Sequence, residues 1–593
     1  MTIYKAPVED MSFLLNHVLG MDEISRLPGY EEATPDMVAA ILTEAARFFD
    51  EVVAPTNMIA DREGLKLEGN QVITPPSLDG VYQQMVDAGW QSLAGDPQYG
   101  GQGMPQLLSF VVDEMCQSAN LSFSLCPLLT KGVITALSRY GSEQQKIEII
   151  PKLMSGQWSG TMNLTEPQAG SDLAAITTKA VPNGDHYLIS GQKIYITWGE
   201  HDYSENIIHL VLARTPDAPE GVKGISLFVV PKVLEGQGES ARNRNDVYCI
   251  GLEEKLGIHA SPTCTMSYGE NGGAVGYLVG KENEGLSYMF AMMNHARQSV
   301  GLQGVAIAER AYQQAVDYAR ERVQGDVPGK SRVTIINHPD VRRMLMTMRA
   351  LTEGGRALAY SSMAHEDLSE KAENEQQSAY HQRRVDLLTP LVKGWCTDVG
   401  LEVASLGIQV HGGMGFIEET GAAQHMRDAR ILPIYEGTNG IQSLDLVGRK
   451  ILRDKGMAAT ELVVEWSEIL TEVEAAGEEM APIARALKAG ITDCSTAVKA
   501  LFKAAVDDWA AAEAGAYNAL MLMGTTAAGA LLAKSALAAV KLNEAGQGNK
   551  DFNDAKIITA NFFAQYVMAR NSGYVAAVQA GPENVMALAE EAF

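Results

Sequence analysis

The sequence predicts a mainly α-helical protein with a central β domain. Apolar residues recur at intervals of three and four from Pro35 to about Met162 and again from Gly285 onward, which is the spacing of helices that bury one face. Between these regions the chain has short runs rich in β-branched residues, bounded by turn residues. Because 593 residues exceed the usual size of one domain, two to four domains are expected.

The chain is expected to divide into five segments. They are an N-terminal extension (1–34), a helical domain (35–161), a middle β domain (162–284), a helical bundle (285–450) and an additional Ala-rich helical domain (451–593). The expected strands include 187–190, 207–213 and 225–230, and the expected bundle helices are 291–322, 339–364 and 383–406. The polar stretch from Ser369 to Gln377 is expected to be a loop or helix end.

Composition and charge exclude several classes of protein. The formal charge of −26 disfavours nucleic-acid and anionic-lipid partners, which require clusters of Lys and Arg. Neither an apolar run of roughly 20 residues nor a basic targeting signal is evident, so no membrane span and a cytoplasmic location are expected. The six cysteines and eleven histidines show no metal-ligand or disulfide spacing, so no metal site is expected.

Three segments have residues suited to binding or catalysis. In Pro433–Gly440, Glu436 lies among apolar residues directly before a glycine, and burial would bring its pKa towards that of a general base. Taken alone, such a glutamate is more often an ordinary loop residue. Met162–Asp172 offers hydroxyls and backbone amides at the predicted change from helices to strands, which on its own is ordinary loop chemistry.

The third segment, Gln409–Phe416, is a glycine-rich turn between predicted helices that would let the backbone approach a phosphate or adenosine. It lacks the preceding strand and the spacing of a Rossmann fingerprint. Gly325–Ser331 has three residues between its glycines where a P-loop has four, so nucleoside triphosphate binding is not expected.

Taken together and in chain order, these segments resemble the acyl-CoA dehydrogenase family across roughly Pro35 to Lys450. The shared motifs are Leu164-Thr165-Glu166-Pro167 with Gly170-Ser171-Asp172, Gly191-Gln192-Lys193 with Ile196-Thr197, Ala308-Glu309-Arg310-Ala311, Gln409 with Gly412-Gly413, and Tyr435-Glu436-Gly437-Thr438. The resemblance implies a helical domain, a β-barrel-like domain and a four-helix bundle, here followed by an extra C-terminal helical domain.

The resemblance also assigns residues to roles. It implies that Glu436 is the catalytic base. The implied FAD contacts are Met162, Leu164, Thr165, Tyr195, Thr197, Arg322, Gln409, Gly413 and Thr438, and the implied acyl-CoA contacts are Ser171, Asn294, Arg297, Tyr435 and Gly437. Tyr195 occupies a position where the family usually has Trp, Asn294 one where it usually has Asp, and Gly440 one where relatives carry a polar side chain.

The implied reaction is removal of a proton from Cα of an acyl-CoA with hydride transfer from Cβ to FAD, giving the trans-2-enoyl-CoA. The whole chain looks most similar to long family members that convert 3-methylmercaptopropionyl-CoA to methylthioacryloyl-CoA in dimethylsulfoniopropionate breakdown. Two alternatives remain open: a dehydrogenase of short or medium fatty acyl-CoA, and an acyl-CoA oxidase.

Partners are also implied by the resemblance. Electron-transfer flavoprotein is the expected electron acceptor, and a homodimer is the expected assembly because long relatives cover a tetramer-forming surface with their extra helices. A remote alternative is a non-catalytic relative that binds DNA through segment 451–593, but that segment has more acidic than basic residues.

Overall fold

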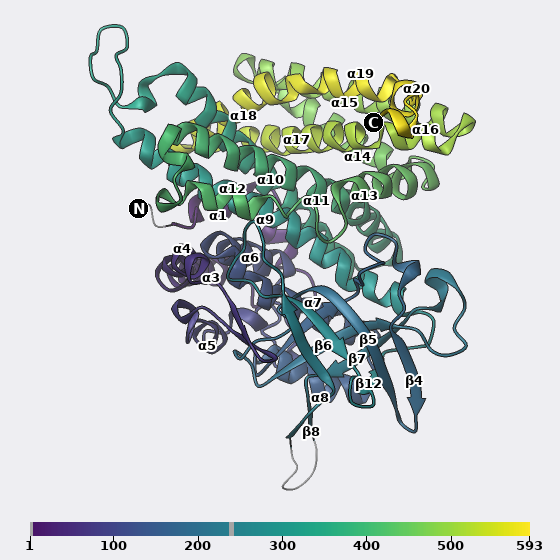
Figure 1. The fold of residues 1–593 in the computed structure, drawn as a ribbon. Helices are drawn as coiled ribbons and strands as arrows, with labels where there is room; N and C mark the ends of the chain where they lie inside the picture. Colours follow the sequence, from purple (N-terminus) through teal and green to yellow (C-terminus); the bar gives the residue numbers. More distant parts are fainter. Residues whose placement is uncertain (1–3, 236–241) are drawn as a thin grey trace. The chain divides into compact units, whose positions relative to one another are not determined.

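The computed structural model describes residues 4–235 and 242–593 and divides the chain into two compact units (Figure 1). The β unit comprises residues 47–104 and 115–296, and the helical unit comprises residues 1–46, 105–114 and 297–593. The chain passes between the units near the end of α3 (Pro35–Phe48), just before and within α6 (Gln106–Ala119), and within α9 (Gly285–Glu321). The predicted order of helical, β and helical regions is confirmed.

The β unit contains an eight-stranded sheet in the order β10-β11-β5-β12-β7-β6-β3, with β4 paired to β5. Its strands are β3 (Trp158–Asn163), β4 (Lys179–Asn183), β5 (His186–Thr197), β6 (Asn206–Ala213), β7 (Ser226–Pro231), β10 (Val247–Leu252), β11 (Thr263–Tyr268) and β12 (Ala274–Leu278). Only β3 and β6 among them pair in parallel. Two short antiparallel pairs are β1 (Lys66–Glu68) with β2 (Gln71–Ile73) and β8 (Val233–Glu235) with β9 (Arg242–Arg244).

The β unit also contains the helices α4 (Asn57–Glu63), α5 (Val81–Asp87), α7 (Leu121–Tyr140) and α8 (Glu143–Met154). Of these, α7 and α8 pack against β3, the strand that leads into the Met162–Asp172 segment. α7 packs along β3, and the Thr130 hydroxyl accepts a hydrogen bond of 3.1 Å from the Gly160 amide. α8 starts with a capping box in which the Ser142 and Gln145 side chains bond each other's backbone amides, which fixes its first turn.

The helical unit combines the bundle with the terminal segments. Its helices, apart from α3, α6 and α9, which are shared with the β unit, are α1 (Val8–His17), α2 (Met21–Ile24), α10 (Pro339–Glu370), α11 (Glu375–His411), α12 (Ala422–Ala429), α13 (Asn439–Leu444), α14 (Met457–Ala475), α15 (Ala481–Asp507), α16 (Trp509–Ala514), α17 (Ala516–Glu544), α18 (Lys550–Phe562), α19 (Asn571–Gln579) and α20 (Glu583–Met586). A π-helical stretch, Asp445–Arg453, follows α13. The polar stretch around Ser369 falls where α10 ends and α11 begins, as predicted.

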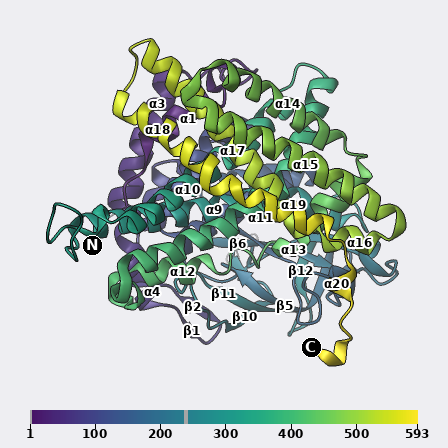
Figure 2. The same cartoon turned by 90° about the horizontal axis from the view of Figure 1, so that it is seen from above.

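Helix α17 is the centre of the additional C-terminal domain. Figure 2 shows it among α14, α15, α18 and α19, and it also packs on α10 and α11 of the bundle. Two glycines allow α11 and α17 to approach closely: a Cβ at Gly394 would lie 2.7 Å from Leu520, and one at Gly524 would lie 2.6 Å from Trp395. The Trp395 indole also donates a hydrogen bond of 3.0 Å to Thr525.

Helices α7 and α17 are long and apolar enough to cross a membrane by length and composition. In each, however, most of the apolar stretch is buried inside the protein: 78% for α7 and 94% for α17. Both are therefore core helices, whose composition reflects packing against other parts of the protein.

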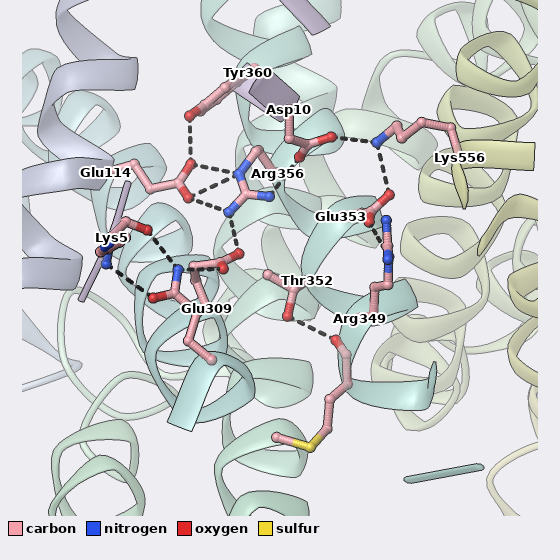
Figure 3. Close-up of polar contacts among 12 residues, drawn as sticks. Lys5, Asp10, Glu114, Glu309, Arg349, Thr352, Glu353, Arg356, Tyr360 and Lys556 are labelled. Carbon is pink, nitrogen blue, oxygen red and sulfur yellow. Dashed lines mark hydrogen bonds and ion pairs between the residues drawn. The ribbon is translucent and has the colours of Figure 1, made fainter. Parts of the chain in front are cut away.

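A buried ion cluster joins the terminal segments to the bundle within the helical unit (Figure 3). We call it the Arg356 cluster; it consists of Asp10, Glu114, Glu309, Arg349, Glu353, Arg356, Tyr360 and Lys556. Arg356 is 1% exposed and donates to Glu114 at 2.7 Å and 2.9 Å, to Asp10 at 2.7 Å and to Glu309 at 2.7 Å. Lys556 of α18 bonds Asp10 of α1 and Glu353 of α10, so three distant segments share one network.

Candidate active site

Glu436 lies in the loop between α12 and α13 of the helical unit. Its φ of 55° is in the left-handed region, and the φ of 84° at Gly437 continues the same unusual turn. A non-glycine residue in this region costs on the order of 1 kcal/mol or more and persists only where its surroundings enforce it. Such strain at a carboxylate points to a functional constraint.

The carbonyl group of Glu436 is held by two side chains, whereas, among the described residues, its backbone N–H is not. Its carbonyl oxygen accepts hydrogen bonds from Arg297 Nε and from Gln442 Nε2, each at 3.4 Å. Within residues 4–235 and 242–593, no acceptor pairs with the Glu436 backbone N–H. This N–H is therefore available as a donor to a ligand, whereas the carbonyl group of the same residue is already held.

The electrostatic setting of Glu436 is that of an incompletely compensated carboxylate. Burial raises its pKa above the usual value, and the positive charges of Arg297 and Lys393 oppose this rise. Among the residues that the structure describes, none donates a hydrogen bond to the carboxylate itself. The group therefore has an increased proton affinity, as a general base acting near neutral pH requires.

The two neighbouring cations are both buried: Arg297 is 6% exposed, and Lys393 of α11 is fully buried. The Lys393 ammonium donates a hydrogen bond of 2.9 Å to Asn439 Oδ1, at the start of α13. Burial lowers the pKa of Lys393 to about 7, although the charges of Glu436 and Asp398 favour its protonated form. The protonation state of Lys393, and with it the positive charge beside Glu436, is therefore sensitive to the polar groups around this side chain.

Residues on either side of Glu436 also have defined positions. The Tyr435 hydroxyl donates a hydrogen bond to the Gln303 side chain on α9. Thr438 caps α13, its hydroxyl accepting from the Ile441 amide at 3.2 Å. The predicted residues Arg297, Tyr435, Glu436, Gly437 and Thr438 thus come together in the helical unit.

In the β unit, the loop after β3 is fixed by a buried ion pair. The Lys193 ammonium donates 2.9 Å to the Leu164 carbonyl and 2.8 Å to Glu166. Burial alone would raise the pKa of Glu166, but Lys193 and hydrogen bonds from Thr177 and Thr178 hold it at about 2. The carboxylate therefore stays ionised and fixes the loop that carries the predicted FAD contacts.

Strand β5 places a further group of predicted FAD contacts beside this loop. The Ile194 amide donates 2.9 Å to the Thr165 carbonyl, and the Thr161 hydroxyl donates 2.6 Å to the Thr197 carbonyl. Between these contacts, Tyr195 has a φ of 59° and a side chain that is 59% exposed. The predicted set Met162, Leu164, Thr165, Tyr195 and Thr197 is thus brought together along β3 and β5.

The remaining predicted residues are exposed. Asn294 lies on α9, Ser171 lies in the loop before a short 3-10 turn, and Arg322 directly follows α9. Gln409 lies in the last turn of α11, and no atom lies within 4 Å of a Cβ built on Gly413. The backbone at Gly413 is therefore open to close approach by a ligand, as the glycine-rich turn predicts.

Sequence patterns missed Gln303, Lys393 and Asp398 as members of the site. Lys393 left a usable signal, since it is a charged residue within the otherwise apolar stretch Leu387–Cys396 of a predicted bundle helix. A cation on a buried helix face requires a polar partner. That partner, Asn439, lies 46 residues away and cannot be found from spacing.

Comparison with known protein families matches nearly the whole chain. Residues 36–157 match "Acyl-CoA dehydrogenase, N-terminal domain", residues 161–270 the middle domain and residues 283–452 the C-terminal domain of the same family. Residues 466–589 match "Acetyl-CoA dehydrogenase C-terminal like". The additional helices are thus a domain type known in its own right.

Individual relatives agree with this match. A 3-methylmercaptopropionyl-CoA dehydrogenase of Ruegeria pomeroyi is 51% identical over 96% of this chain and 97% of its own length. A butyryl-CoA dehydrogenase of Syntrophomonas wolfei is 34% identical over 100% of this chain and 99% of its own. An acyl-CoA dehydrogenase from Bacillus anthracis, solved in complex with FAD, shares the fold with a TM-score of 0.76 at 21% identity, covering 96% of this chain and 91% of that one. The chain therefore belongs to the acyl-CoA dehydrogenase family and is an enzyme of acyl-CoA dehydrogenation.

Proposed function

We propose that this enzyme converts 3-methylmercaptopropionyl-CoA to methylthioacryloyl-CoA with Glu436 as the catalytic base. The observation that carries the role of Glu436 is its half-buried carboxylate, which lies beside two cations without a hydrogen-bond donor among the described residues. The choice of substrate is supported by the 51% identity to the Ruegeria pomeroyi enzyme over nearly the full length of both chains.

The proposed roles follow from the geometry of the loop. The Glu436 carboxylate removes a proton from Cα of the thioester while a hydride leaves Cβ, so that a carbon–carbon double bond forms between these atoms. The free N–H of Glu436 donates to the thioester oxygen and stabilises the negative charge that develops there. Arg297 and Gln442 bind the carbonyl oxygen of the same residue, which helps to keep the N–H donor and the carboxylate of Glu436 in place.

The residues present fit FAD as the cofactor. Tyr195 presents an exposed ring, and the Glu166–Lys193 pair fixes the neighbouring loop. Gly413 offers open backbone, and Arg322 offers an exposed cation for a diphosphate. When bound, FAD supplies the acceptor for the hydride that leaves Cβ. In the β unit, the proposed contacts are those that the sequence predicts on and beside β3 and β5; in the helical unit, they are Arg322, Gln409, Gly413 and Thr438.

The proposed electron acceptor is electron-transfer flavoprotein, and the proposed assembly is a homodimer. Both proposals are supported by the family to which the chain belongs. Peroxide formed in stoichiometric amounts in aerobic turnover would instead identify an oxidase. Sedimentation analysis of the FAD-loaded protein distinguishes a dimer from a tetramer.

An anaerobic titration tests the proposed function. Purified protein with bound FAD is mixed with 3-methylmercaptopropionyl-CoA, butanoyl-CoA or octanoyl-CoA, and the loss of oxidised-flavin absorbance is followed. We expect the sulfur-containing thioester to bleach the flavin fastest at limiting concentration. Faster reduction by octanoyl-CoA would reassign the substrate, and a flavin that no thioester reduces would contradict the function.

A further inference from the structure

The additional C-terminal domain reaches the polar groups that surround the candidate base. Tyr517, in the first turn of α17, donates a hydrogen bond of 2.8 Å from its hydroxyl to Asp398 Oδ2 on α11. Asp398 lies five residues beyond Lys393 on α11, and both side chains form hydrogen bonds with Asn439. Tyr517 is 45% exposed, and its hydroxyl is directed to the half-buried Asp398 side chain.

Asn439 connects the two charged residues of α11 to the loop of Glu436. Its Nδ2 donates 2.9 Å to Asp398 Oδ1, while its Oδ1 accepts from Lys393 at 2.9 Å. The same Nδ2 also lies 3.0 Å from the Gly394 carbonyl and 3.0 Å from the Thr397 hydroxyl. Because Asn439 is the first residue of α13, three residues after Glu436, its position sets where the loop ends.

The hydrogen bonds therefore link the additional domain to the site by converging on Asp398, which accepts from Tyr517 on one side and from Asn439 on the other, while Lys393 donates to Asn439. The packing of α17 on α11 also fixes the part of α11 next to Lys393. Leu520 fills the space beside Gly394, and Thr525 accepts a hydrogen bond from the next residue, Trp395. Each oxygen of the Asp398 carboxylate thus has its own donor. Because both of its oxygens already accept hydrogen bonds, the Asp398 carboxylate does not compete with Glu436 for the Lys393 ammonium.

We propose that Tyr517 is a positioning residue for the dehydrogenation reaction: by binding Asp398, it keeps Asn439 and Lys393 in place beside Glu436. The additional domain would then act on the chemistry of the bundle as well as on its packing. This inference rests on the proposed role of Glu436. It assigns a function to a residue that belongs to the added domain and not to the three domains that carry the family motifs.

Other charged groups act on the same centre and must remain constant in a test. The groups that influence Glu436 and its two cations are Arg297, Lys393, Asp398, Tyr435, Asp445 and Arg449. Arg430 and Tyr574 also act on Asp398. Tyr517→Phe leaves all of these side chains in place and removes only the hydroxyl that donates to Asp398.

The test is the pH dependence of flavin reduction in FAD-loaded Tyr517→Phe. Without the hydroxyl, Asp398 Oδ2 loses its donor and draws the Lys393 ammonium away from Glu436. Because a base must be deprotonated to act, a weaker positive charge beside Glu436 moves the acidic limb of the profile to higher pH. We expect a shift of about 0.5 unit, hence a loss of about threefold at pH values below the midpoint and little change above it.

Two further variants complete the experiment. Lys393→Met keeps the volume of the side chain but removes its charge, and we expect a shift of about 1 unit in the same direction. Tyr566→Phe is the matched control, because Tyr566 is an exposed tyrosine of the same domain that stacks on Phe562. Bound FAD and the unfolding temperature are measured for each variant, since a purely structural role would change these and leave the pH midpoint in place.

The outcomes separate this inference from the proposed function. If Lys393→Met shifts the midpoint and Tyr517→Phe matches Tyr566→Phe, the additional domain has no role in positioning and the inference fails. If neither variant shifts a well-defined midpoint, the inference fails as well. A wild-type enzyme whose flavin is not reduced by any acyl-CoA would instead refute the proposed function.

Discussion

The Arg356 cluster and the Glu436 loop both bury ionisable groups in the helical unit, but they pair them differently. In the cluster, Arg356 donates to three carboxylates, and Lys556 bridges Asp10 to Glu353 (Figure 3). At Glu436, two buried cations lie near a carboxylate that accepts no hydrogen bond from the described residues.

This difference in pairing separates a structural role from a chemical one. Removing a partner from a fully hydrogen-bonded buried pair leaves an uncompensated charge, so such a network favours one arrangement of its helices. A carboxylate with nearby charge but no donor keeps a raised pKa and stays available to take a proton. The same kinds of side chain thus have different roles because of their hydrogen bonds.

The largest effect is expected for Glu436→Gln. The amide cannot accept the Cα proton, so we expect the rate of flavin reduction to fall by about 10³- to 10⁴-fold, with FAD binding and the unfolding midpoint retained. Anaerobic stopped-flow measurements of flavin reduction with saturating substrate provide the value. The control is Glu419→Gln, which changes an exposed glutamate in the 3-10 turn before α12. A rate within tenfold of wild type would show that another group is the base.

A large loss of stability without a loss of chemistry is expected for Arg356→Met. Glu114, Asp10 and Glu309 would remain buried without this cation, which destabilises the folded state by about 3–5 kcal/mol. Urea unfolding measures the loss, and the rate of reduction per bound flavin should stay within about twofold. Arg343→Met on the same helix removes an exposed pair with Asp340 and should cost less than about 1 kcal/mol. Equal stability of the two variants would contradict the role of the cluster.

The smallest effect concerns acid stability. Burial raises the pKa of Asp10, but Lys556 and Arg356 outweigh it and lower the pKa from 3.8 to about 2. A carboxylate whose pKa is depressed by folding stabilises the protein above its unfolded pKa and loses this contribution as pH falls towards the folded one. Between pH 4 and pH 2, wild type should therefore lose about 2 kcal/mol more than Asp10→Asn.

Urea unfolding of wild type and Asp10→Asn at several pH values in this range measures the difference. Glu9→Gln is the matched control, because Glu9 precedes Asp10 on α1 but is exposed. The same dependence on pH in all three proteins would mean that Asp10 is not ionised in the cluster. Folding would then not lower the pKa of Asp10, just as it does not lower that of Glu436.

Much of the candidate site could be predicted from the sequence, because its motifs are local. Glu436, Gly437 and Thr438 are consecutive, and the Met162–Thr165 loop is a single run, so their order along the chain was sufficient to place them. The fold class was predicted from the change between helical and strand periodicity and is confirmed. The left-handed backbone of Glu436 could not be predicted, because it depends on contacts from Arg297 and Gln442.

By itself, the sequence determined the order of secondary structure, the family and the residue proposed as the base. The tertiary structure alone decided which distant groups act on that base, and which charged residues are only structural. Asp10 meets Arg356 across 346 positions, and Tyr517 meets Asp398 across 119. Periodicity specifies which face of a helix is buried, but not which side chain it meets, because that depends on how the helices pack. The role of a buried charge depends on this partner.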